Sequence, residues 1–168
     1  LFATSVITAA ESILAGDNYS IIVCDFESSQ AKLDQKLHFL KSRSVDGLIL
    51  FPGKYNCSET LQEYIEDGIP VVIVNDDMPS FQTDKVTVDN SNASFRAVEC
   101  LINQNHRDIA IINGDLDTYT GRERYKGYLE ALQTYDIKPR DEWIAYGHFS
   151  NRGGYEAAKN LLSLKRPP

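Results

Sequence analysis

The sequence has few of the residues that build covalent cross-links and metal centres. Among its 168 residues there are three cysteines, three histidines, one methionine and one tryptophan. Cys24, Cys57 and Cys100 are odd in number, widely spaced and without a CxxC pattern. This spacing gives no disulfide framework and favours a reducing compartment. The cysteines also have no zinc-ligand spacing with the histidines, so we expect no resident metal ion.

Long hydrophobic runs and an excess of positive charge are missing too. No apolar run approaches the roughly 20 residues of a transmembrane helix, and no basic segment followed by an apolar one opens the chain. The net charge is −7 and the isoelectric point is near 4.9. An acidic segment of this kind is a poor match for the phosphate backbone of DNA. We therefore expect these residues neither to enter a membrane nor to bind DNA themselves.

Motifs of the common enzyme classes are also absent. There is no P-loop, no GxGxxG, no Ser/His/Asp or Cys/His order and no catalytic pair of carboxylates. Asp25 follows an apolar run, as does the phosphoacceptor of response-regulator receivers. That interpretation needs a second acidic pair and a later lysine at a strand end, and the sequence has neither. We expect no catalytic activity and no cofactor.

What the sequence does contain is an alternation of short apolar runs with helical periodicity. The apolar runs predict buried strands, at 19–24, 47–51, 70–74, 86–88, 109–112 and 143–146. Between these strands, apolar residues recur every three or four positions, which predicts helices. The predicted helices are at 2–14, 29–40, 60–67, 90–105, 120–132 and 153–162. A βαβα alternation of this kind predicts an α/β fold with doubly wound parallel sheets.

Residues that favour helix ends mark several boundaries. The first helix, with Phe2, Val6 and Leu14 on its apolar face, is predicted to end at 16–18. The N-caps are predicted to be Ser28 or Ser29 for the second helix, Asn90 or Ser91 for the fourth, and Thr120 for the fifth. Glu123 stands three residues after Thr120, which is the spacing of a capping box.

A division into two lobes is predicted at Asp89–Asn90, where a short strand is followed by a long helix. Residues 1–89 would form an N-terminal lobe and residues 90–168 part of a C-terminal lobe. A doubly wound sheet normally has a central strand before its first helix, and the last βα unit normally leads to another strand. We therefore expect the chain to be an internal part of a longer protein, truncated at both ends and lacking the first strand of the N-terminal lobe.

Arg124 is predicted to lie at a helix position that is electrostatically unfavourable for a positively charged residue. It is predicted in the first turn of the helix at 120–132, where the helix dipole disfavours a cation. Helical side chains lean toward the N-terminus, so the guanidinium would point to the crevice beyond the strand at 109–112. Ligands of open α/β sheets bind in that crevice. Two interpretations stay open, namely ligand contact and an ion pair with Asp115 or Asp117.

Several segments together resemble one protein family, the effector-binding domain of LacI/GalR-type transcription regulators. The resemblance covers nearly the whole chain in the family's order and spacing, and it rests on VDGLILFP (45–52), IPVVIVN (69–75) leading to VTVDN (86–90), LINQNHRDIAIING (101–114), TGRERYKGYLEAL (120–132) and WIAYGHFSNRGGYEAAKNLL (143–162). Two positions depart from the family pattern. Asn105 replaces the usual glycine before a histidine, and asparagine still tolerates the left-handed conformation of a helix end. Asn75 stands where sugar-binding members often have aspartate.

The resemblance implies a type I periplasmic-binding-protein-like fold whose two lobes hold a small, sugar-like effector. It also implies a cytoplasmic homodimer that binds DNA only through an N-terminal helix-turn-helix headpiece, which is absent from these residues. The alternative is a secreted sugar-binding receptor of an ABC transporter, which has the same fold and binds no DNA. The headpiece or a signal sequence upstream of Leu1 would discriminate between the two.

Matched position by position, the resemblance also implies a set of effector-binding residues. A guanidinium, an aromatic face and side-chain oxygens are suited to a polar ring-shaped ligand. Other roles stay open for three of them, because Phe2 and Phe51 could belong to the core and Asp76 could solvate a turn. The implied residues are Leu1, Phe2, Phe51, Asn75, Asp76, Arg124 and Phe149.

Overall fold

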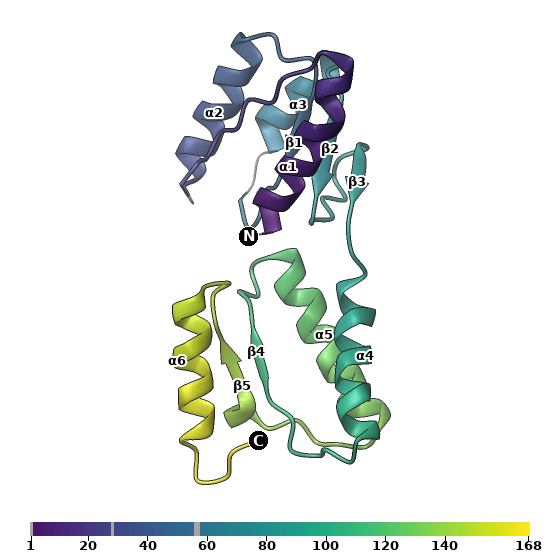
Figure 1. The fold of residues 1–168 in the computed structure, drawn as a ribbon, viewed down its shortest axis with the longest axis vertical. Helices are drawn as coiled ribbons and strands as arrows, with labels where there is room; N and C mark the ends of the chain where they lie inside the picture. The colour runs from purple at the N-terminus through teal and green to yellow at the C-terminus, as the bar shows by residue number, and fades with distance from the viewer. Residues whose placement is uncertain (1, 28, 56–57) are drawn as a thin grey trace.

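The computed structural model describes residues 2–27, 29–55 and 58–168. Figure 1 shows two α/β lobes, one above the other, and the chain passes between them on the segment that joins β3 to α4. Each lobe has its own parallel sheet, with strand order β1-β2-β3 in the first and β4-β5 in the second. The predicted α/β class with parallel strands is therefore confirmed. The lobe boundary at Asp89–Asn90 stays a prediction.

The first lobe is built on a short sheet whose middle strand is buried. β2 (Val71–Val74) pairs in parallel with β1 (Leu48–Leu50) and with β3 (Asp84–Val86). α2 (Gln30–Ser42), α3 (Ser58–Glu66) and Phe81 of the loop before β3 contribute the other apolar residues of the core. The buried core residues of this lobe are Leu33, Leu37, Leu40, Leu48, Leu50, Leu61, Tyr64, Val71, Ile73 and Phe81.

The second lobe places its two strands between helices, with α6 on one side and α5 on the other (Figure 1). β4 (Ile111–Asn113) pairs in parallel with β5 (Ile144–Tyr146), which follows the short 3-10 turn η2 (Asp141–Trp143). α6 (Asn151–Leu162) begins after β5. The carboxyl ends of β4 and β5 consequently lie at the same edge of the sheet, next to the first lobe.

α4 (Asn90–Asn103) and α5 (Tyr119–Thr134) lie against each other (Figure 1). Gly127 allows their close approach, since a Cβ at that position would be only 2.0 Å from the backbone oxygen of Ser91. The buried Tyr128 hydroxyl donates a 2.9 Å hydrogen bond to the carbonyl of Ile109. This bond ties α5 to the segment that leads into β4. The buried core of the second lobe consists of Val98, Ile102, Ile109, Tyr128, Ala131 and Leu132.

The strand predicted at 19–24 does not form, and that prediction is wrong. Residues 19–26 run without strand pairing in the described chain. Ile22 is 55% exposed and Val23 is 61% exposed. An apolar β-branched run becomes a buried strand only where a neighbouring strand supplies its hydrogen bonds and cover. Here Cys24 and Phe26 still pack on the core, so only the end of the segment is anchored.

The first predicted helix is confirmed as α1 (Phe2–Leu14), but it contributes no buried residue to the fold. It ends, as predicted, in the short turn η1 (Ala15–Asp17), after which Asn18 has a left-handed φ of 62°. Phe2 is 54% exposed and Ile13 is 71% exposed. The periodicity therefore identified the helix correctly, and its apolar face is not covered by the described residues.

Helix ends were predicted with mixed success. Ser29 is the N-cap of α2, and its hydroxyl accepts from Lys32 N at 3.5 Å, while Ser28 lies outside the described residues. The N-cap of α4 is Asp89 and not Asn90 or Ser91. Asn105 has a left-handed φ of 69° just beyond α4, as the sequence predicted for a helix end. The strand predicted at 86–88 forms two residues earlier, as β3.

Candidate functional site

The site begins at the turn between β4 and α5, which starts earlier than the sequence predicted. Thr118 is the N-cap, and its hydroxyl accepts from Gly121 N at 3.1 Å. The predicted cap, Thr120, is instead buried inside the first turn. Buried Asn113 donates a 2.9 Å hydrogen bond to the Gly121 carbonyl, which fixes this turn to the end of β4. The capping box with Glu123 is therefore wrong.

Because α5 begins at Tyr119, Arg124 lies in the second turn, where the helix dipole opposes a cation less than in the first. Its Nε–H donates a 2.8 Å hydrogen bond to Oδ1 of Asn90. Asn90 is only 3% exposed and is itself held by a 3.0 Å bond from Nδ2 to the Val88 carbonyl. This contact fixes the guanidinium by one edge. Within the described residues, no hydrogen bond or ion pair engages its terminal nitrogens.

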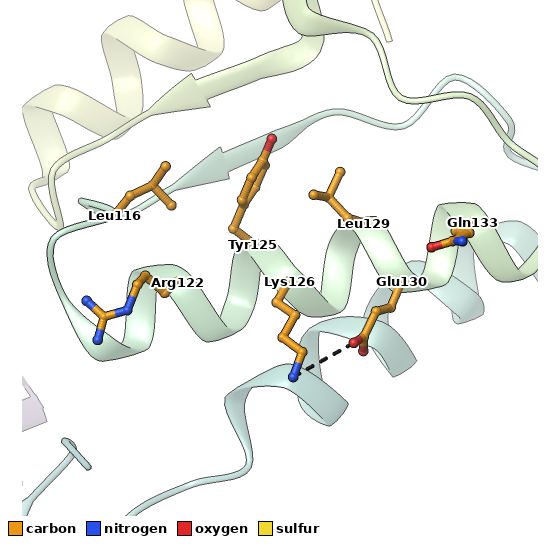
Figure 2. Close-up of a pocket in the computed structure, with 7 residues that line it drawn as sticks. All are labelled: Leu116, Arg122, Tyr125, Lys126, Leu129, Glu130 and Gln133. Atoms are coloured by element: carbon orange, nitrogen blue, oxygen red, sulfur yellow. Dashed lines mark ion pairs between the residues drawn. The ribbon is translucent and has the colours of Figure 1, made fainter. Parts of the chain in front are cut away.

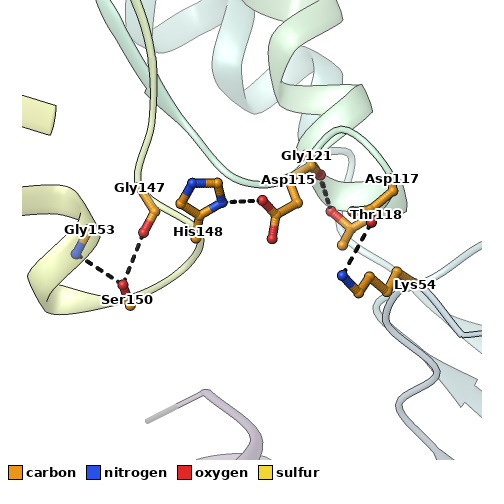
Figure 3. A network of polar contacts seen from close by, with 9 residues as sticks. All are labelled: Lys54, Asp115, Asp117, Thr118, Gly121, Gly147, His148, Ser150 and Gly153. Carbon is orange, nitrogen blue, oxygen red and sulfur yellow. Dashed lines mark hydrogen bonds and ion pairs between the residues drawn. The ribbon is translucent and has the colours of Figure 1, made fainter. Parts of the chain in front are cut away.

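The predicted alternative partners of Arg124 bind other residues. Asp115 contacts His148, whose Nδ1 meets Oδ1 of the carboxylate (Figure 3). Asp117 forms a 3.4 Å ion pair with Lys54, which comes from the loop after β1 in the other lobe. The negative charge of Asp117 raises the pKa of Lys54. The ion-pair interpretation of Arg124 with either aspartate is therefore wrong.

Phe149 lies in the loop between β5 and α6 and is 56% exposed. Its ring rests against Gly114, because a Cβ at Gly114 would be 1.9 Å from the Cζ atom of the ring. The backbone φ of Phe149 is 50°, in the left-handed region. The ring is thus supported on one side by the β4–α5 loop and offers the rest of its surface to solvent.

Two of the implied residues from the first lobe form an aromatic pair. The rings of Phe2 and Phe51 are 6.4 Å apart at 78°, an edge-to-face arrangement. Such pairs are stabilised by the opposite charges of ring edge and ring face. Phe2 is exposed and Phe51 is half-buried, so neither is a core residue. Leu1, the first residue of the implied set, lies outside the described residues.

Asn75 and Asp76 follow β2 directly. Asn75 has a left-handed φ of 63° and its N–H donates a 2.8 Å bond to the Val86 carbonyl. Asp76 is 9% exposed, and this burial raises the pKa of its carboxyl group. A backbone hydrogen bond from Asp77 and the positive charge of Arg122, which belongs to the other lobe, oppose the shift. Asp76 is therefore a buried carboxyl group close to the boundary between the lobes and not a solvated turn residue.

The structure groups these residues at three strand ends. Arg124 follows β4, Phe149 follows β5, and Asn75 with Asp76 follows β2. Sequence reasoning missed three residues that make long-range contacts in this region, namely Asn90 with Arg124, Lys54 with Asp117 and His148 with Asp115. Their partners are 34, 63 and 33 positions away in the chain, so no local spacing could reveal them.

Two depressions on the described surface lie elsewhere. One of about 410 Å³ lies along α5 (Figure 2), and its lining residues are Leu116, Arg122, Tyr125, Lys126, Leu129, Glu130 and Gln133. The other, also about 410 Å³, lies beside β5 and α6 and includes His148 and Tyr146. Neither is lined by Arg124, Phe149 or Asp76. These three residues therefore lie near strand ends of both lobes and outside these two depressions.

Over the described residues, no group of three or more His, Cys, Asp or Glu side chains is placed to hold a metal ion. None of the helices there is both long and apolar enough to cross a membrane.

Comparison with known proteins decides the family. The family model described as "Periplasmic binding proteins and sugar binding domain of LacI family" matches residues 2–168. The chain belongs to this family. Membership confirms the predicted fold and the predicted resemblance. It also agrees with the expectation that the chain is not an enzyme, because the similar proteins are transcriptional repressors and regulators.

Individual relatives support the same assignment. The transcriptional repressor PurR of Edwardsiella ictaluri is 33% identical over 166 residues, which are 97% of this chain and 48% of the repressor. A transcription regulator from Lactobacillus plantarum has a TM-score of 0.79 at 26% identity, covering 95% of this chain and 58% of its own. A complex of the regulator CelR with cellobiose has a TM-score of 0.82 at 26% identity, covering 96% of this chain and 49% of its own. The chain spans about half the length of the curated relatives that it matches.

Proposed function

We propose that this chain is the effector-sensing part of a LacI-type transcription regulator and binds a small, sugar-like molecule between its two lobes. The observation that carries the proposal is the placement of Arg124 and Phe149 after neighbouring strands of one sheet. A guanidinium fixed through Nε by buried Asn90 and a half-supported aromatic ring stand at the carboxyl ends of adjacent parallel strands. Ligands of open α/β sheets bind at such strand ends.

The chemistry of these groups suits a ring-shaped polar ligand. The free edge of the Arg124 guanidinium offers donors in a planar fork. Phe149 offers an apolar face on which a ring can stack. From the first lobe, buried Asp76 and half-buried Asn75 supply oxygen acceptors for hydroxyl or N–H groups. A buried acceptor such as Asp76 discriminates against ligands that lack donors. The Phe2–Phe51 pair, with Leu1 before it, would close the apolar side of the site.

The regulator would act as a cytoplasmic homodimer and contact DNA through a helix-turn-helix headpiece outside residues 1–168. The acidic charge of −7 supports a separate DNA-binding element. Cys24 and Cys100 are both free, which suits a reducing compartment. The second candidate is a secreted sugar-binding receptor of a transporter, which the breadth of the matching family supports. A helix-turn-helix upstream of Leu1 would favour the regulator and a signal peptide the receptor.

Mutation of Arg124 tests the proposed site. We would screen sugars, with cellobiose among them, by thermal shift and measure the binding of each hit by calorimetry. Arg124→Ala should weaken binding by about 1.5–3 kcal/mol, because ligand groups lose charge-assisted hydrogen bonds, or about ten- to hundredfold. Arg124→Lys should be almost as weak, since it keeps the charge but loses the planar fork. Phe149→Ala should cost a similar amount through lost stacking.

Neither side chain lies in the apolar core. The melting temperature without ligand should therefore change little in Phe149→Ala and fall modestly in the two Arg124 variants, which lose the guanidinium donor to buried Asn90. A cooperative melting transition in all three variants separates binding from folding. Wild-type affinity in Arg124→Ala would show that the effector binds elsewhere.

A further inference from the structure

The backbone that carries Phe149 has an uncommon conformation. His148 and Phe149 are consecutive and both have left-handed φ values, 51° and 50°. For residues other than glycine this region is sparsely populated, and for an aromatic residue it persists only where surrounding contacts impose it. Two such residues in a row therefore need specific restraints on both sides of the turn.

One side of the turn is fixed by α6. Ser150 is the N-cap of that helix, and its hydroxyl accepts from Gly153 N at 3.0 Å. The backbone N–H of Ser150 also donates a 3.0 Å hydrogen bond to the Gly147 carbonyl, which closes the turn across His148 and Phe149. These bonds anchor the base of the loop but do not reach the ring of Phe149.

The other side of the turn is held by the loop after β4. Nδ1 of His148 meets Oδ1 of Asp115 (Figure 3). The ring of Phe149 covers the neighbouring Gly114. Residues 114–115 thus contact residues 148–149 in pairs, one contact polar and the other apolar. Within the described residues, the His148–Asp115 contact is the only side-chain hydrogen bond between these two loops. A hydrogen bond with an ionised partner is stronger than a neutral one.

We propose that His148 is a positioning residue, which clamps its loop to Asp115 and so holds the Phe149 ring on Gly114 before any effector binds. The role of the ring in binding rests on the function proposed above. A ring held in place beforehand need not be ordered during binding, and preorganisation of this kind increases affinity. His148 itself need not touch the effector.

The position of the ring can be measured without any ligand. An aromatic ring lying on Gly114 shifts the Hα resonances of that glycine, so NMR of the intact protein with labelled glycine reports the contact directly. Phe149→Ala defines the signal without a ring. His148→Ala should move the Gly114 resonances most of the way to that position. His148→Asn should restore them, because asparagine tolerates left-handed φ and its amide can still donate to Asp115.

Affinity shows whether the position matters for binding. With cellobiose as the probe, His148→Ala should weaken binding about three- to tenfold in the wild-type background. It should have no further effect in the Phe149→Ala background, because His148 acts through the ring. His106→Ala, which changes an exposed histidine of the same lobe, is the matched control and should bind like wild type.

The two arms keep the two proposals apart. Gly114 resonances that stay unchanged in His148→Ala would overturn the positioning role, whatever the affinity. Resonances that move, combined with wild-type binding in Phe149→Ala or no binding of cellobiose at all, would support the clamp and count against Phe149 as the platform for this sugar. Resonances that move together with a loss of affinity confined to the background that has Phe149 would support both.

Discussion

At the scale of single residues, the site depends on partners that lie far away in the chain. The sequence identified Arg124 by its position against the helix dipole, but the residue that fixes it is Asn90, from the preceding helix. The sequence predicts Asn90 or Ser91 as a helix cap, since asparagine and serine favour that position. Asp89 takes the cap instead and leaves the Asn90 side chain buried. Because the N-cap of α4 lies one residue before Asn90, the Asn90 side chain does not cap its own helix and binds Arg124 of α5 instead.

Asp76 yields a prediction at the same scale. Burial raises the pKa of its carboxyl group above the ordinary value of 3.8. An acid with a raised pKa in the folded state binds its proton more tightly there than in the unfolded chain. Its stabilising contribution is complete below the unfolded pKa and is lost as the pH rises through the folded pKa. Ionised Asp76 should therefore destabilise the unliganded protein at neutral pH.

Asp76→Asn should accordingly raise the melting temperature at pH 7. The difference from wild type should shrink as the pH falls, and it should vanish below the ordinary carboxyl pKa, where both side chains are neutral. Melting curves by circular dichroism between pH 3 and pH 8 measure this, with exposed Asp46→Asn as a control that should shift little. A lower melting temperature for Asp76→Asn at pH 7 would show that the charge of Arg122 outweighs the burial.

At the scale of elements, the parallel strands and most helices could be predicted from periodicity, because helix and strand spacings differ clearly over one or two turns. The helix faces with Leu33, Leu37 and Leu40 and with Tyr128 and Leu132 are buried, as apolar residues three and four positions apart on a helix generally are. The segment 19–24 has the same β-branched composition as β2 but remains unpaired in the described chain. Composition gives the tendency to form a strand, and the neighbouring strand decides whether it forms.

Candidate site residues could be predicted to the extent that they follow strands, since parallel strands bring their carboxyl ends to one edge. Arg124, Phe149, Asn75 and Asp76 were found in this way or through family resemblance. The contacts that hold them, such as His148 with Asp115, join two loops and follow from neither periodicity nor spacing. Sequence patterns therefore locate the edge of the sheet, whereas tertiary packing sets the orientation of each side chain there.

Two glycines of the second lobe provide a matched test of helix packing. Gly127 of α5 meets the backbone of Ser91, and a Cβ there would lie 2.0 Å from a carbonyl oxygen. Gly127→Ala should force α4 and α5 apart and destabilise the lobe by about 1–3 kcal/mol or more. Gly154 of α6 has no atom within 4 Å of such a Cβ. Gly154→Ala should stabilise the same lobe by about 0.5–1 kcal/mol, because alanine loses less backbone entropy in a helix.

Urea unfolding of the intact protein, followed by circular dichroism, measures both substitutions in one lobe. The midpoint should fall for Gly127→Ala and rise for Gly154→Ala. Equal shifts of the two midpoints would contradict the close helix contact in the structure, since a Cβ at Gly127 would then meet no more resistance than one at Gly154.

At the scale of the whole molecule, the two lobes are joined by the chain between β3 and α4 and by charges that face each other. The Lys54–Asp117 ion pair joins the two lobes at 3.4 Å. The positive charge of Arg122 in the second lobe lowers the pKa of Asp76 in the first and partly offsets the effect of burial. Both contacts lie next to residues proposed to bind the effector. These charges already influence the distance between the lobes. A ligand that binds between the lobes would interact with the same charges, and its binding could therefore change the lobe arrangement.

The surface of α1 leads to a prediction about assembly. At 100° per residue, Val6 and Ile13 fall on one narrow stripe of the helix, and Ile13 is 71% exposed. An exposed apolar stripe on a monomer is costly, and a two-fold symmetric dimer buries the same stripe from both copies. We expect the intact protein to be such a dimer with α1 at or beside the interface.

Ile13→Glu should therefore dissociate the dimer. Each copy would lose the burial of one isoleucine, worth about 1.5–3 kcal/mol, and would place a carboxylate against apolar surface at the two-fold axis. Sedimentation at micromolar concentration should give a dimer for the wild type and a monomer for Ile13→Glu. Thr8→Glu introduces the same charge on the opposite face of α1, where Thr8 is already exposed, and should remain dimeric. A wild-type protein that sediments as a monomer, or an Ile13→Glu variant that stays a dimer, would exclude α1 as the interface. In either case the apolar stripe of α1 would not be buried between two copies of the chain.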